Sequence, residues 1–277
     1  MEFLERAEYY FLPEKYHRKH DICEFLIGQI ESFITEDTYK GLKVYVYEVN
    51  ANDVETHDEH VFDFLLRTNR TKEHDEIITR QIIYGLIIDI CYFVQESLLA
   101  SMKKRLTVTF ALIRKPFVFD LIILLRLYLT EDFIQQFNTI EKFDTTKLEK
   151  DDLIELINFS AKILITTAIQ PNDVYNFIFN LSESDSLINI TNRALHPSTT
   201  RNKQNLTGLQ NINFIFSTEK EIEKQWDYLY NRLPLLLTYM LEVIEFMVND
   251  TLKIDDDFYF KRLKYRAEFL SNKMNNK

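Results

Sequence analysis

The chain has 277 residues, 46% of them hydrophobic, and it carries a formal net charge of −10. It has only four glycines, so no GxGxxG or GxxxxGK[ST] loop can be written, which argues against the nucleotide-binding α/β folds built on such loops. The acidic balance argues against a protein that coats nucleic acid, because such proteins carry a basic surface. No secretory signal is visible, and both cysteines lie among apolar residues, as is typical of a reducing compartment. We expect a cytoplasmic protein that does not engage a membrane.

Apolar spacing predicts helices through the first half of the chain. Residues 17–35 repeat apolar side chains three and four apart, and 52–66 read as a short helix. Residues 72–102 follow a capping residue, Thr71, and are apolar nearly all round, which is typical of a central buried helix. Residues 106–129 continue the helical pattern, with a break or kink predicted at Pro116 because its ring removes an N–H donor.

The second half is also helical, with one long polar interruption. Residues 148–167 are amphipathic, and 171–181 begin at a proline. Thr218 and Glu221 match a capping box that opens a helix over 218–249, with a kink expected at Pro234, and 255–276 form a terminal helix. The stretch 192–210 is the longest polar loop.

One segment has a weak β-strand propensity rather than a helical pattern. Residues 42–49 are rich in β-branched and aromatic side chains and could pair with 213–216 as a minor two-stranded element. The chain as a whole predicts an all-α, up-and-down helical bundle with long central buried helices. We expect a single helical domain over 1–277, with 1–70 as an N-terminal subregion and 192–210 as a polar loop insertion.

Arg67 and His74 are separated by six residues at a predicted helix–loop–helix junction. This spacing resembles the Arg-x(4–6)-His signature of the HEPN superfamily, compact helical domains that include RNase toxins and abortive-infection effectors. The resemblance implies a metal-independent endoribonuclease, or a phage-defence effector, that acts on RNA as a homodimer and needs no cofactor. In such a site the guanidinium clamps the scissile phosphate and the imidazole moves a proton near neutral pH.

The long polar loop supplies a second group of candidates. Arg193 and His196 are further catalytic candidates, because the loop is locally basic within an acidic chain and His196 precedes a proline that restricts its backbone. The side chains expected to bind the substrate are all basic: Arg70, Arg201 and Lys203.

Two other classes of function stay open. One is a non-catalytic helical module that binds a regulatory protein partner, with 22 Phe and 15 Tyr supplying contact surface. The other is a metal-dependent phosphohydrolase of the HD kind, since three His-Asp dipeptides occur, at His20, His57 and His74. We do not assign a metal site.

Charged residues also interrupt the predicted core helices. Asp89 and Glu96 are seven apart and share a helical face, with Arg80 two and a half turns earlier. Because a buried charge persists only when it is paired, we expect them to form an internal network with Arg114 or Arg126.

Overall fold

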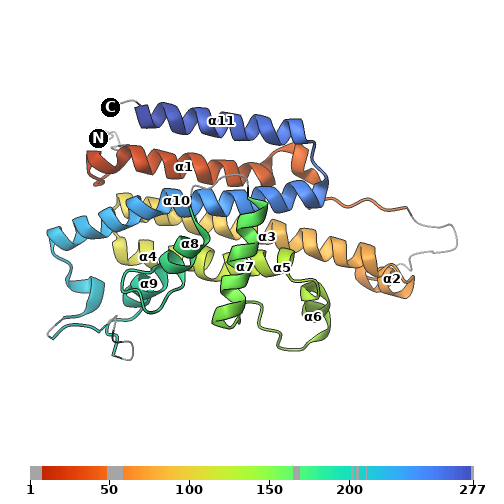
Figure 1. The fold of residues 1–277 in the computed structure, drawn as a ribbon, viewed down its shortest axis with the longest axis horizontal. Coiled ribbons are helices and arrows are strands. Elements are labelled where there is room, and N and C mark those ends of the chain that lie inside the picture. Colours follow the sequence, from red (N-terminus) through yellow and green to blue (C-terminus); the bar gives the residue numbers. More distant parts are fainter. Residues whose placement is uncertain are drawn as a thin grey trace, which may run out of the picture.

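The computed structural model describes residues 8–48, 59–164, 169–200, 203, 206–209 and 211–275. These residues form eleven α-helices and no strand, so the predicted all-α class is confirmed (Figure 1). In chain order the helices are α1 Glu14–Thr35, α2 Val61–Arg67, α3 Thr71–Met102, α4 Leu106–Arg114, α5 Leu121–Leu129, α6 Phe133–Thr139, α7 Lys150–Ile163, α8 Pro171–Ile178, α9 Leu187–Leu195, α10 Glu219–Leu252 and α11 Asp256–Asn275.

Three long helices form the centre of the bundle. α1 packs along α10 and α3, and α3 packs against α4 on its other side. In Figure 1, α11 lies outside α1, whereas α4, α5 and α7 to α9 lie on the opposite side of α10 and α3. The side chains at the centre are fully buried and apolar, among them Ile30, Val94 and Ile244. The hydrophobic effect therefore holds the three long helices together.

α10 begins as its sequence predicts. The side chain of Thr218 accepts a hydrogen bond from the backbone N–H of Glu221, and the Thr218 N–H donates to Glu221 Oε2 at 2.7 Å. This reciprocal capping box satisfies donors that the first turn leaves free. The helix continues through Pro234 to Leu252.

The predicted interruption at Pro116 is a π-helical turn. α4 leads into the turn Lys115–Asp120, and α5 begins at the next residue. A wider turn accommodates the proline, which has no N–H for the helical ladder. As a consequence the carboxyl group of Asp120 is buried between α3 and the turn, with only 2% of the residue exposed.

α3 covers the whole range predicted for it and begins one residue earlier, at Thr71. Among the described helices it alone is long and apolar enough to cross a membrane by length and composition, and 39% of its most apolar stretch is buried within the protein. Its first turns extend beyond the main core, where Ile77 packs with Phe64 and Leu65 of α2 in a small separate cluster (Figure 1).

The predicted two-stranded element does not form in the described part of the two segments. Asp37–Leu42 and Asn213–Phe216 are 3₁₀ helices, and 43–48 have no regular structure; Val49 lies outside the described residues. The aromatic side chains that suggested a strand pack against the α2–α3 cluster instead. Tyr45 donates a hydrogen bond to Glu76 Oε2 at 3.0 Å, and its ring lies 4.7 Å from the guanidinium of Arg80.

Candidate functional site

Arg67, the first predicted catalytic residue, is the last residue of α2, and its guanidinium is held by the carboxylate of Glu59. Its Nε donates to Glu59 Oε1 at 2.7 Å and its Nη2 to Glu59 Oε2 at 2.8 Å. A bidentate pair of this kind uses the same fork of donors that would hold a phosphate. A phosphate would therefore have to compete with Glu59.

His74 lies in the first turn of α3 and is 7% exposed. Its Nδ1 is 2.9 Å from Asp75 Oδ1, and its ring packs edge-on against Phe62 with 5.2 Å between centroids. Arg70, from the turn between the two helices, donates to the carbonyl oxygen of Glu48 at 2.5 Å. The α2–α3 junction thus brings the predicted residues into one region, each with a partner from this chain.

The His-Asp dipeptides do not converge in the described part of the chain. His20 Nδ1 is 3.1 Å from the hydroxyl of Tyr230, and burial lowers the pKa of His20 to about 4. Asp21 accepts from Tyr9 at 2.7 Å and from Lys273 at 2.6 Å, whereas His57 lies outside the described residues. Within the ranges that the structure describes, no three His, Cys, Asp or Glu side chains are grouped so that they could hold a metal ion.

The predicted internal network divides into separate contacts, so that prediction was wrong. Arg80 donates to the carbonyl oxygen of Gly41 at 3.1 Å, and Glu96 is exposed. Asp89 pairs with Lys115 of the π-helical turn at 2.7 Å rather than with an arginine. Seven-residue spacing gives a shared face, but it does not identify what packs against that face.

The two arginines proposed as partners of the network bind elsewhere. Arg114 Nη1 donates to Thr191 Oγ1 at 2.9 Å and to Asn192 Oδ1 at 2.8 Å, both on α9. Arg126 Nη1 donates to the carbonyl oxygen of Asp144 at 2.8 Å. These contacts fix α9 and the loop before α7 against the bundle.

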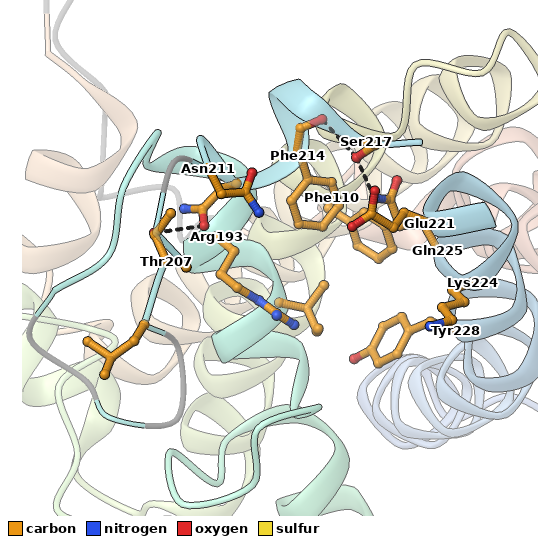
Figure 2. A pocket seen from close by; sticks show the side chains of 14 residues that line it. Phe110, Arg193, Thr207, Asn211, Phe214, Ser217, Glu221, Lys224, Gln225 and Tyr228 are labelled. Carbon is orange, nitrogen blue, oxygen red and sulfur yellow. Dashed lines mark hydrogen bonds between the residues drawn. The ribbon is translucent and has the colours of Figure 1, made fainter. Parts of the chain in front are cut away.

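A cavity of about 350 Å³ lies between α9, α10 and the segment 206–217. We call it the Arg193 cavity. Its walls are Arg193 and Ile190 of α9, Phe110 of α4, Lys224, Gln225 and Tyr228 of α10, and side chains from the segment 206–217 together with Glu221 (Figure 2). Volumes of this size are typical of sites for small molecules.

Arg193 and Tyr228 extend toward each other from opposite walls (Figure 2). Arg193 Nε is buried, and no group among the described residues accepts a hydrogen bond from it; burial lowers the pKa of this arginine. The Tyr228 hydroxyl is likewise buried without a hydrogen-bond partner there, and burial raises its pKa. Two donors thus face one cavity without an acceptor from the described chain.

Several other polar side chains of the wall have hydrogen-bond partners within the chain. Thr207 Oγ1 donates to Asn213 Oδ1 at 2.9 Å, and Asn213 Nδ2 donates to the carbonyl oxygen of His196 at 2.5 Å. The carboxylate of Glu221 accepts from Thr218, and the hydrogen bond from the Thr218 N–H lowers its pKa. The polar loop is therefore held in place by side-chain bonds, and the acidic group in the wall is already engaged.

Of the polar-loop residues that were predicted as functional and are described by the structure, only Arg193 lines the cavity. α9 extends to Leu195, so Arg193 lies on a helix, whereas His196 and Lys203 are exposed and do not line the cavity. Arg201 lies outside the described residues.

Sequence reasoning missed Lys224 and Tyr228, because both read as ordinary positions of an amphipathic helix. Their four-residue spacing, which places them on one face of α10, was the available signal.

Comparisons of the chain with protein-family models, with curated proteins and with solved structures found no match.

Proposed function

We propose that this protein binds a small anionic ligand in the Arg193 cavity. The oxyanion, a phosphate or a carboxylate, pairs with Arg193, and the body of the ligand packs on the apolar side chains of Phe110, Ile190 and Phe214. The observation that carries the proposal is the half-buried guanidinium of Arg193, whose buried Nε has no acceptor among the described residues.

The energetic argument is that a charge removed from water needs a partner. Withdrawing an ion from water costs several kcal/mol, and a paired oxyanion offsets that cost. Lys224 adds a second positive charge to the same wall, and the Tyr228 hydroxyl adds a neutral donor. An anion is the ligand that satisfies all three groups.

The test is isothermal titration calorimetry with one phosphate and one carboxylate of similar size, adenosine 5′-monophosphate and indole-3-acetate. We expect at least one of them to bind, and Arg193→Gln to weaken binding by about tenfold or more, because a hydrogen bond to a charged group contributes roughly 1.5–3 kcal/mol. The preferred probe tells which oxyanion the cavity takes.

The matched control is Arg18→Gln. This substitution also removes one positive charge from a half-buried arginine, but from α1 and outside the cavity wall. Absence of binding by either probe, or equal loss in both variants, would overturn the proposal.

A metal-independent ribonuclease of the HEPN kind is the second candidate. One observation favours it: Arg67 and His74 lie on either side of a short turn between two helices, as the resemblance implies. Activity would require an RNA phosphate to replace Glu59 on Arg67, and a homodimer to bring two such junctions together.

Induction in a bacterial host separates the two candidates. We expect a ribonuclease to slow growth, and the Arg67→Ala/His74→Ala pair to relieve that toxicity while Arg193→Ala/His196→Ala does not. Relief by the second pair alone would instead place the toxic activity at the Arg193 cavity. Unaffected growth with the wild type would argue against a constitutively active toxin.

A further inference from the structure

A second hollow, of about 460 Å³, adjoins the Arg193 cavity along α10. Lys224 and Tyr228 line both of them. The far wall of the second hollow is formed by Arg232 and Asn231 of α10 and by Phe177 of α8, and we call it the Arg232 hollow.

The three α10 side chains that connect the two hollows lie on one helical face. Lys224, Tyr228 and Arg232 are spaced by four residues, so the first and last are separated by ~12 Å along the helix axis. The guanidinium of Arg232 lies 4.3 Å from the centre of the Tyr228 ring and 5.2 Å from that of Phe177. This stacking holds a second cation against the Tyr228 ring.

The carboxylates around the hollows are already engaged. Asp227 accepts from the Tyr16 hydroxyl at 2.8 Å and lies 3.7 Å from Lys15. Asp185 pairs with Arg232 but is itself more than half exposed, so a phosphate bound there would have to replace it on Arg232. Lys224 has no hydrogen bond or ion pair to another described side chain and acts on Glu221 only through its charge, so its ammonium group is available to a ligand.

We infer that the ligand spans both hollows and carries two phosphate groups, as a nucleoside bisphosphate or a dinucleotide does. One phosphate lies against Arg193 and Lys224, and the other lies against Arg232. Phosphate suits the first position better than carboxylate, because its three terminal oxygens can accept from Arg193, Lys224 and the Tyr228 hydroxyl together. The inference rests on the proposed function, since it extends the ligand that the Arg193 cavity binds.

The experiment compares adenosine 5′-monophosphate with adenosine 3′,5′-bisphosphate by calorimetry on the full chain. We expect the bisphosphate to bind the wild type about tenfold tighter. Arg232→Gln should remove this advantage and leave the affinity for the monophosphate unchanged, whereas Arg193→Gln should weaken both ligands.

Lys220→Gln is the matched control, because it removes one positive charge from an exposed position of α10 outside both hollows. If the bisphosphate binds no tighter than the monophosphate, or if Arg232→Gln changes neither affinity, the two-phosphate ligand is overturned and the anion site at Arg193 stands. If neither nucleotide binds the wild type, the two-phosphate ligand is overturned, and binding of indole-3-acetate then decides whether the anion site itself stands.

Discussion

Asp120 is a buried acid in the π-helical turn, beside Asp89 and Lys115. Burial, followed by its hydrogen bond with Asp89 and that residue's negative charge, raises its pKa to about 8, while Lys115 acts in the opposite direction. Between its ordinary value and about 8, the unfolded chain releases a proton that the folded protein keeps, so Asp120 lowers the free energy of unfolding as pH rises. The change in the free energy of unfolding caused by Asp120→Asn should therefore depend on pH. We expect that change to be ~2 kcal/mol more favourable to the folded state at about pH 8 than at about pH 5.

Urea denaturation at the two pH values measures this difference. Asp151→Asn serves as the control, because it removes the same carboxyl group from an exposed position in the first turn of α7. An effect of Asp120→Asn that is equal at both pH values would show that Asp120 is ionised in the folded protein.

At the scale of the element, α10 depends on its capping box. Thr218→Ala removes the hydroxyl that accepts from the Glu221 N–H, and we expect the free energy of unfolding to fall by ~1 kcal/mol. The single tryptophan, Trp226, reports unfolding by fluorescence, because it is 5% exposed and its Nε1 donates to the carbonyl oxygen of Ser101 at 3.2 Å.

Thr200→Ala is the control for the cap, since Thr200 is exposed and belongs to no helix. The same methyl and hydroxyl groups are removed there without affecting a helix end. Equal stability of the two variants would mean that the cap contributes nothing to α10.

At the scale of the whole molecule, a buried carboxylate attaches α11 to the bundle. Glu245 of α10 is fully buried and accepts from Arg262 Nε at 2.9 Å and from Arg266 Nη2. Arg262 also donates to Ser32 Oγ of α1 at 2.7 Å, so one arginine joins three helices. We expect Glu245→Ala to lower the free energy of unfolding by ~3–5 kcal/mol, because it removes the buried anion that the two arginines share and leaves Arg262 with Glu36 at 3.9 Å.

Urea denaturation gives the stability change, and limited proteolysis followed by mass spectrometry shows whether cleavage concentrates in α11. Glu268→Ala is the matched control: Glu268 lies on α11 itself but is exposed and only 3.9 Å from Lys264, so we expect a change below ~1 kcal/mol. Similar cleavage patterns in the two variants would contradict a role for Glu245 in attaching the helix.

Local patterns in the sequence determined most of the helices. The apolar run of α3, the capping box of α10 and the interruption at Pro116 all depend on residues within a few positions of one another. Such signals survive in the fold because helical spacing, caps and the missing proline N–H act within a turn or two. The strand predicted at 42–49 does not form over the described residues 42–48, because a strand needs a partner that no local pattern supplies.

Only the tertiary structure decided which charged groups have partners. Sequence alone offered both Arg67 and Arg193 as catalytic candidates, yet Glu59 holds the first and no described group accepts from the buried Nε of the second. The sequence also could not place Lys224 and Tyr228 opposite Arg193. A loop separates these two residues from Arg193, and they approach it only when α9 and α10 pack together. A binding site needs side chains from distant parts of the chain to converge, and that convergence is a property of packing rather than of local spacing.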